Sequence, residues 1–260
     1  MKSRKSLRSR IPRSADFSHA AAASASMATL MSRSDSSQIG GFADIDISRG
    51  HRTAFPEVIY CENKSIAQIL SIVKRTYAKK NLVLGTRCPE EFFPRLKRTF
   101  PKGLFRKESR SFRIGKPLPP ISNLTVGIIS AGTTDVAVCE EGALILESLG
   151  VRIQRIYDVG VAGIHRLFAS DQRIKNSAVL IVAAGMEGAL PSVVAGLYHQ
   201  PLIAIPTSIG YGTALSGFTA LFAMLTSCSP GVTVVNINNG VGAAAAALKI
   251  LRLVELHRKK

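Results

Sequence analysis

The stretch TVGIISAGTTD, residues 125–135, begins as an apolar run without alternation and ends in small and polar residues. An unbroken apolar run of this length is typical of a strand covered on both faces. Four similar runs follow, at residues 151–157, 178–184, 202–206 and 232–237, and the segments between them have helical spacing. Strands that alternate with helices predict a parallel sheet between two layers of helices.

Ligands of such sheets bind beyond the carboxyl ends of the strands, so residues just after each run are the first candidates for a site. After the first run these are Ser130, Gly132, Thr133 and Asp135. Small residues let the backbone approach a ligand, and the following helix offers free N–H groups to a phosphate. Asp135 is a candidate to touch a ribose or substrate group; the structural alternative is an ordinary helix cap.

The second run ends in YDVGVAGIHR, residues 157–166. Asp158 follows the expected strand directly, and His165 stands beside Arg166, which joins a titrating group to an anion binder. We predict that Asp158 binds substrate and that His165 is catalytic. The alternative is a histidine with a purely structural role.

The third and fourth runs lead into glycine-rich loops. Gly185 precedes Glu187, a carboxylate that could meet a ligand, a base or a metal ion, or else could only cap a helix. Ser208 and Gly210 lie in PTSIGYGTALSG, a polar loop suited to a phosphate or an adenine edge, or else a flexible connection. We predict that Gly185, Ser208 and Gly210 bind substrate.

The chain has four cysteines and no CxxC pair, so disulfides and structural zinc are both disfavoured. Cys228 ends the expected helix FTALFAMLTSC. By residue type alone, a buried structural cysteine is favoured there over a nucleophile.

Residues 188–248 contain no Asp, Glu, Lys or Arg. Four prolines and many glycines interrupt this stretch, which excludes a membrane span. Helices of a soluble α/β domain normally carry charge on their outer faces, so uncharged helices indicate cover by another subunit. The sequence therefore predicts a homo-oligomer.

The net charge of +17 belongs to the front of the chain. Residues 1–120 hold 24 Lys and Arg against 9 Asp and Glu, and residues 121–260 hold 10 against 8. No aromatic residues interleave the basic ones as a nucleic-acid surface requires, so no nucleic-acid partner is expected. Residues 1–38 are predicted to be a disordered basic leader. Its Ser-rich, acid-poor start suits a transit peptide to a mitochondrion or plastid; otherwise the protein would be cytoplasmic.

Residues 39–120 form a separate middle section. Apolar residues at helical spacing from Ile66 to Val73 and a short apolar run at 81–85 predict a helix followed by a strand. The prolines at 117–120 predict an extended linker to the domain at 121–260.

Taken together, several strings of this chain resemble the LarB family of nickel-pincer cofactor biosynthesis. They are DIDISRGHRTAFPEVIYCENKS and LGTR in the middle section, then SAGTTD, YDVGVAGIHR, VAAGMEGALPSVVAGL, PLIAIPTSIGYG, MLTSC and VVNINNG. The resemblance covers about residues 40–250. It implies a three-layer, flavodoxin-like parallel sheet of the AIR carboxylase type, with a smaller N-terminal α/β section, and an octamer or similar closed ring.

The resemblance also implies a reaction. LarB enzymes carboxylate the pyridinium ring of nicotinic acid adenine dinucleotide with carbon dioxide or bicarbonate, and they cleave its phosphoanhydride to release AMP. Cys228 matches the cysteine that adds to the ring. Glu187 matches an acidic active-site residue and is the candidate to hold a metal, Mg²⁺ being the candidate cofactor, or to activate water.

Two alternatives stay open. One is an AIR carboxylase-like enzyme of purine synthesis, although the family string Ser-Ala-His-Arg-Thr-Pro is replaced here by a shifted AGIHR at 162–166 that lacks Thr-Pro. The other is a non-catalytic nucleotide-binding oligomer. Retention of Cys228, Glu187 and Asp135 favours an enzyme.

Overall fold

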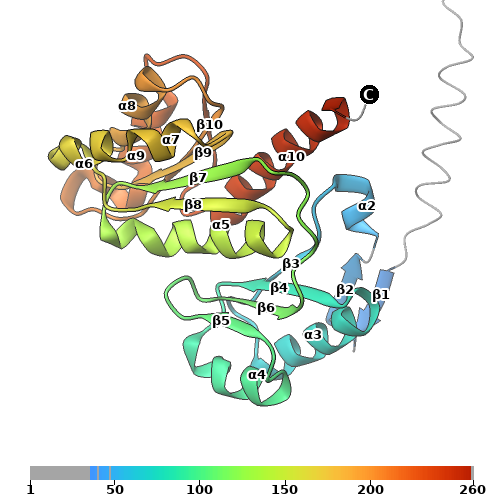
Figure 1. The fold of residues 1–260 in the computed structure, drawn as a ribbon. Coiled ribbons are helices and arrows are strands. Elements are labelled where there is room, and N and C mark those ends of the chain that lie inside the picture. Colours follow the sequence, from blue (N-terminus) through green and yellow to red (C-terminus); the bar gives the residue numbers. More distant parts are fainter. Residues whose placement is uncertain (1–35, 40, 47, 259–260) are drawn as a thin grey trace, which may run out of the picture.

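The computed structural model describes residues 36–39, 41–46 and 48–258 (Figure 1). The predicted leader at 1–38 therefore lies almost wholly outside the described residues. Within the described part of the chain, no helix combines the length and the apolar character that a membrane crossing requires.

The C-terminal half contains the predicted five-stranded parallel sheet. Its strands run in the order β11-β10-β9-β7-β8, and β7 pairs with β9. The chain therefore leaves β7 toward β8 on one side of the sheet, and it leaves β9 toward β10 and β11 on the other side. The strands are β7 (Thr125–Ser130), β8 (Arg152–Ile156), β9 (Val179–Ala184), β10 (Leu202–Pro206) and β11 (Val232–Val234). This order confirms the flavodoxin-like fold, and it puts a topological switch point between β7 and β9.

Helices cover both faces of this sheet, as predicted. One face carries α5 and α10, which approach closely because Gly142 and Gly240 meet without side chains between them. The other face carries the remaining helices, which bury a second apolar cluster. The helices are α5 (Val136–Ser148), α6 (Ile164–Ala169), α7 (Asp171–Lys175), α8 (Leu190–Leu197), α9 (Phe218–Leu225) and α10 (Gly240–Arg258).

The N-terminal section is a smaller α/β unit with its own buried core. The helix predicted from Ile66 is α3 (Ile66–Lys80), which begins with a capping box between Ser65 and Gln68. Its mixed sheet has the order β3-β4-β6-β5. The strands are β3 (Val58–Tyr60), β4 (Leu82–Thr86), β5 (Leu104–Arg106) and β6 (Ser111–Gly115), and the other elements are β1 (Ser36–Ile39), β2 (Ala43–Asp46), α2 (Arg49–Thr53), η1 (Glu90–Phe92) and α4 (Phe93–Thr99).

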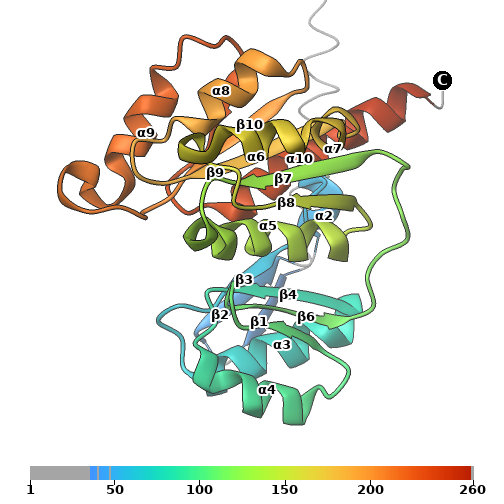
Figure 2. The ribbon, with the colours of Figure 1, turned by 60° about the vertical axis from the view of Figure 1, so that its left-hand side comes forward.

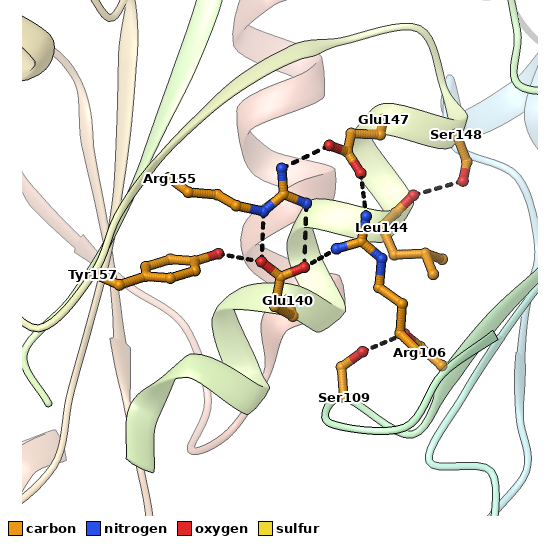
Figure 3. A network of polar contacts seen from close by, with 9 residues as sticks. Arg106, Ser109, Glu140, Leu144, Glu147, Ser148, Arg155 and Tyr157 are labelled. Atoms are coloured by element: carbon orange, nitrogen blue, oxygen red, sulfur yellow. Dashed lines mark hydrogen bonds and ion pairs between the residues drawn. The ribbon is translucent and has the colours of Figure 1, made fainter. Parts of the chain in front are cut away.

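This smaller sheet packs against α5 of the C-terminal domain (Figure 2). Leu84 of β4 is fully buried in the same cluster as the apolar side of α5. An ionic network closes the contact (Figure 3). Arg106 of β5 pairs with Glu140 and, at 2.9 Å, with Glu147, both on α5. Arg155 of β8 bonds the same two carboxylates at 2.5 and 2.8 Å.

The Tyr157 hydroxyl donates a hydrogen bond to Glu140 Oε1 at 2.7 Å. Each carboxylate oxygen of Glu140 therefore has at least one charged or hydroxyl donor, which is what a mostly buried carboxylate requires. The ion pairs from Arg106 to Glu140 and Glu147 therefore join the N-terminal section to the C-terminal domain.

Candidate functional site

The carboxyl ends of all five parallel strands meet at one edge of the sheet, and the loops that leave them form the candidate site. Five non-glycine residues in these loops have left-handed backbone conformations: Asp158 (φ 58°), Met186 (φ 52°), Leu215 (φ 46°), Ser216 (φ 54°) and Asn238 (φ 57°). Such conformations cost of order 1 kcal/mol each and concentrate at sites where loop shape matters. We call this group of loops the strand-edge cluster.

Asp135 lies at the centre of the strand-edge cluster and is buried. Its Oδ2 accepts the N–H of Gly132 at 2.9 Å, and its Oδ1 accepts the hydroxyl of Thr207 at 2.6 Å. Burial raises the pKa of Asp135, although these hydrogen bonds oppose the rise. The side chain does not cap α5 itself, but its bond to the Gly132 N–H forms the capping box of the 3-10 turn that leads into α5, which is the structural alternative weighed above. Through Thr207, Asp135 also joins the loops after β7 and β10.

Ser130 and Asp158 link the first two strands. The buried Ser130 hydroxyl accepts the backbone N–H of Asp158 at 3.0 Å, and the Asp158 carboxylate pairs with Arg166 of α6. His165 points to an exposed position beside that pair and makes no hydrogen bond with the described residues. Its ring nitrogens are therefore free to meet a ligand at this edge.

The loop after β9 is pressed against the loop after β10. The Met186 N–H donates to the carbonyl of Ile209 at 2.7 Å, and a Cβ on Gly185 would lie 2.4 Å from the same carbonyl oxygen. Only glycine fits there. Glu187 follows in a turn and is exposed, and α8 begins at Leu190 without a side-chain cap, so Glu187 is not a cap either.

Ser208 is held by Asn238, which follows β11. The Ser208 N–H donates to Asn238 Oδ1 at 2.9 Å, and Asn238 Nδ2 donates to the Ser208 hydroxyl at 2.8 Å. Thr207 and Asn238 were not among the sequence-predicted residues. Their signals were present, because a hydroxyl residue follows the fourth apolar run directly and two asparagines follow the fifth.

Gly132, Thr133 and Gly210 also lie in the loops predicted for them. Thr133 is exposed at the start of the 3-10 turn η2 (Thr133–Asp135), and a Cβ on Gly132 would meet only Asp135 and Thr134. Gly210 is exposed and has φ 150°, a value that favours glycine. The structure thus brings the predicted substrate-binding residues and two of the predicted catalytic ones, His165 and Glu187, to one edge.

Cys228 lies outside the strand-edge cluster. Helix α9 ends at Leu225, earlier than predicted, and carries the chain from that edge toward the amino end of β11. The residues beside the cysteine are tied to α8: the Ser227 hydroxyl accepts from Ser192 at 2.8 Å, and Ser229 donates to the Ser192 carbonyl at 2.9 Å. Cys228 itself is exposed, so a buried structural role is wrong. The other three cysteines are buried.

A second buried acid, Glu141 of α5, was not among the residues predicted from the sequence. Its Oε1 accepts from Arg87 Nε at 3.0 Å, and its Oε2 accepts the Gly240 N–H at 3.1 Å at the start of α10. Burial raises the pKa of Glu141, and the positive charge of Arg87 opposes the rise. Arg87 comes from the N-terminal section and also donates to the backbone carbonyl of Asn238. The N-terminal section therefore contacts the border of the strand-edge cluster.

Among the described residues, no three His, Cys, Asp or Glu side chains come together as a metal site. Hydroxyls, amides, backbone N–H groups and single carboxylates line the strand-edge cluster. Such a surface suits a polar organic ligand with phosphate groups.

Comparisons with known proteins divide the chain at the same place as the structure does. Residues 36–116 match the family described as the LarB/PurE-like N-terminal domain, and residues 125–259 match the AIR carboxylase family. An uncharacterised protein of Methanocaldococcus jannaschii is 39% identical over 218 residues, which cover 81% of this chain and 84% of that protein.

Other relatives match over about half of this chain. The N5-carboxyaminoimidazole ribonucleotide mutase of M. jannaschii is 36% identical over 131 residues, 48% of this chain and 78% of the mutase. The phosphoribosylaminoimidazole carboxylase of Schizosaccharomyces pombe is 29% identical over 140 residues, 51% of this chain and 24% of that protein.

Proposed function

Since this chain belongs to the LarB family and carries a PurE-type domain, we propose that it carboxylates the pyridinium ring of nicotinic acid adenine dinucleotide and hydrolyses the phosphoanhydride to release AMP. The AIR carboxylase domain and its relatives make the protein an enzyme of the carboxylase or mutase type. The substrate and the hydrolytic step belong to the proposal. The observation that carries it is the exposed Cys228 thiol in a chain that also has the LarB-type N-terminal domain.

A pyridinium carbon does not attack carbon dioxide by itself, because the ring is electron-poor. A thiolate that adds to the ring forms an S–C bond and turns the ring into an enamine, whose carbon then attacks carbon dioxide. That carbon loses its proton, the S–C bond breaks, and the aromatic ring returns with the thiolate. Cys228 is the one exposed cysteine of the four and is our candidate for this role.

The strand-edge cluster would hold the nucleotide. Thr133 and the turn that leads into α5 would offer backbone N–H groups to a phosphate, and Arg166 would offer a charge-assisted donor. His165 is exposed and precedes Arg166 in the chain, and in this proposal it would transfer a proton at this edge. Glu187 is an exposed carboxylate suited to orienting water at the phosphoanhydride.

One carboxylate such as Glu187 is compatible with Mg²⁺, which commonly takes one or two carboxylates together with substrate phosphates. When bound there, Mg²⁺ would neutralise charge on the phosphoanhydride. Glu187→Gln should therefore leave dinucleotide binding largely intact and reduce AMP release more than ring carboxylation.

We propose that the enzyme is a homo-oligomer. The uncharged segment forms α8, α9 and the loop between them, and large apolar side chains are exposed on it: Leu197, Tyr211, Leu215, Phe218, Phe222 and Leu225. An apolar surface of this extent marks a protein contact. We propose further that contact across this face brings Cys228 of one copy to the strand-edge cluster of another, because the thiol lies outside that cluster in its own chain.

Incubation of the purified protein with nicotinic acid adenine dinucleotide, bicarbonate and Mg²⁺ tests the reaction. We expect AMP and a ring-carboxylated mononucleotide by mass spectrometry. Carboxylation of aminoimidazole ribonucleotide instead would favour the second candidate, a purine-synthesis enzyme, which the mutase relatives support. Tight nucleotide binding without turnover of either substrate would indicate a non-catalytic protein.

A further inference from the structure

The N-terminal section contains two cysteines, Cys61 and Cys88, at the ends of neighbouring strands. Cys61 follows β3 directly, and Cys88 stands shortly after the end of β4. The two strands pair in parallel with Tyr60 opposite Thr86, and the Cys61 N–H extends the ladder by donating to the Thr86 carbonyl at 2.9 Å. The sheet therefore brings both cysteines to one end of the N-terminal section, although no CxxC spacing joins them in the sequence.

The conformation of Arg87 decides which side chain lies beside Cys61. Successive side chains of a strand point to opposite sides, and Tyr60 is exposed while Cys61 is buried. A regular continuation of β4 would place Arg87 on the buried side. Arg87 instead has φ 52°, which interrupts the alternation, and its guanidinium bonds to Glu141. Cys88 then joins Cys61 in the same buried apolar cluster.

The two thiols are close enough to interact. A side-chain hydrogen bond with Cys88 raises the pKa of the Cys61 thiol, and burial raises it further. Each sulfur also lies near a backbone carbonyl, Cys61 Sγ at 3.6 Å from Ile59 and Cys88 Sγ at 3.7 Å from Pro89. Two cysteines on paired strands with their side chains on the same side meet the spatial requirement for a disulfide.

We propose that Cys61 and Cys88 form a reversible disulfide, which joins the end of β3 to the segment after β4. The oxidant is a small-molecule disulfide of the glutathione type. One cysteine loses its proton and attacks this disulfide, which forms a mixed disulfide and releases one thiol of the oxidant. The other cysteine then loses its proton and attacks the mixed disulfide, which releases the second thiol. Two S–H bonds of the protein are replaced by one S–S bond, and two electrons reduce the oxidant to two thiols.

The site has a route for the oxidant. Both cysteines are 0% exposed, so a local opening must precede the first attack. β3 has three residues and lies at the edge of its sheet, where only β4 pairs with it. A short edge strand opens more easily than the sheet as a whole. Because thiolate is scarce at a buried cysteine, oxidation should take on the order of hours.

The disulfide would act on the junction between the two parts of the molecule. Cys88 adjoins Arg87, which bonds to Glu141 and to the backbone carbonyl of Asn238 at the border of the strand-edge cluster. A bond from Cys88 to Cys61 closes a loop of about 27 residues, which restricts both the unfolded chain and the opening of β3. The N-terminal section would therefore be held more firmly at this border in the oxidised protein, whichever substrate the enzyme uses.

Incubation of the reduced full chain with glutathione disulfide, followed by alkylation, digestion with trypsin and mass spectrometry, tests the proposal. We expect residues 53–64 joined to residues 88–95, since trypsin cleaves after Lys and Arg, and we expect reductant to separate them. The exposed Cys228 should take up glutathione instead, which its mass distinguishes.

Two physical changes should accompany the cross-link. Hydrogen exchange of the Cys61 amide should slow by at least about tenfold, because the disulfide opposes the opening of β3. Amides of β5, at the other edge of the same sheet, should exchange as before. The melting temperature should rise by roughly 5 °C or more.

The variants separate this pair from the other cysteines. Cys61→Ser and Cys88→Ser should each lose the cross-linked peptide and the rise in melting temperature, whereas Cys139→Ser, at a buried cysteine of α5, should keep both. A wild-type protein that retains both thiols after a day in the oxidant would overturn the proposal without reference to any variant. Separate glutathione adducts on Cys61 and Cys88, with no cross-linked peptide, would overturn it as well.

Discussion

The two faces of the C-terminal sheet are covered in different ways. On one face, α5 meets the N-terminal section through buried apolar residues and the network of Arg106, Glu140 and Arg155. On the other face, α8 and α9 carry no charge and expose large apolar side chains such as Phe222. The first face is therefore complete within one chain, and the second is suited to a contact with another.

The difference between the two faces suggests that residues of the proposed site lie on both of them. The covered face brings Arg87 and Tyr60 of the N-terminal section to the border of the strand-edge cluster. The open face carries Cys228, which is exposed and outside that cluster. The proposed binding groups thus come from within the chain, and the proposed nucleophile lies at the surface where we propose that copies meet.

The largest expected effect is at Cys228 on the open face. Cys228→Ser should lower the rate of ring carboxylation at least a hundredfold, because serine is a poor nucleophile and no base adjoins it among the described residues. Fold and dinucleotide binding should be retained. The control is Cys61→Ser in the buried core, which should lower stability but keep the activity of each folded molecule. Ring carboxylation by Cys228→Ser at near the wild-type rate would end the covalent mechanism.

The next effect concerns assembly on the same face. Phe222→Glu puts a charge on a side chain that is 57% exposed in one chain. If this face packs against another copy, the charge would be desolvated and the oligomer should dissociate, as measured by light scattering. Leu256→Glu, at an exposed position near the end of α10, is the control and should not change the mass. A wild-type protein that is monomeric at micromolar concentration would contradict the prediction.

Substitutions on the covered face should change the stability of the fold and not the mass of the oligomer. Glu140→Gln leaves Arg106 and Arg155 with one carboxylate fewer, and Glu140 is only 12% exposed. We expect the free energy of unfolding to fall by about 2 kcal/mol, since hydrogen bonds to charged groups are worth roughly 1.5–3 kcal/mol each. Glu255→Gln breaks an exposed pair with Arg258 and should cost less than about 0.5 kcal/mol. If denaturant titrations show that Glu140→Gln and Glu255→Gln lower the free energy of unfolding equally, the buried network stabilises the fold no more than an exposed ion pair does.

The smallest effect is a pH dependence from Asp135. Because burial raises its pKa above the usual 3.8, the protonated form favours the folded state. That contribution is complete below pH 3.8 and is lost as pH rises through the raised pKa. Relative to the wild type, Asp135→Asn should therefore gain stability as pH rises from 4 to 7, in unfolding experiments at matched ionic strength. A variant whose stability falls relative to the wild type over this range would show that the Asp135 pKa is not raised.

Much of the fold could be predicted because its signals are local. The unbroken apolar run at 125–129 and its four counterparts required strands covered on both sides, and α3 has its capping residues in the sequence. The boundaries moved by a few residues where loop geometry intervened. The run at 232–237 stops as β11 at Val234, since the chain then turns toward the left-handed Asn238.

The candidate site was predictable only in part. Glycines and polar residues directly after apolar runs located Ser130, Asp135, Gly185 and Ser208, because parallel strands end at one edge. Thr207 was missed although its hydroxyl is bonded to Asp135. The partners are 72 residues apart in the chain, and no local pattern pairs them.

The sequence by itself determined the layers of this protein and the edge at which the candidate site lies, since apolar periodicity and strand order follow from short stretches of chain. Only the tertiary structure decided that Glu141 is a buried acid paired with Arg87, that Tyr60 and Asn236 share a cleft, and that Cys228 is exposed away from the strand ends. The reason is physical: burial and pairing depend on which segments the folded chain brings together, and Arg87 and Asn238 meet across 151 residues of sequence.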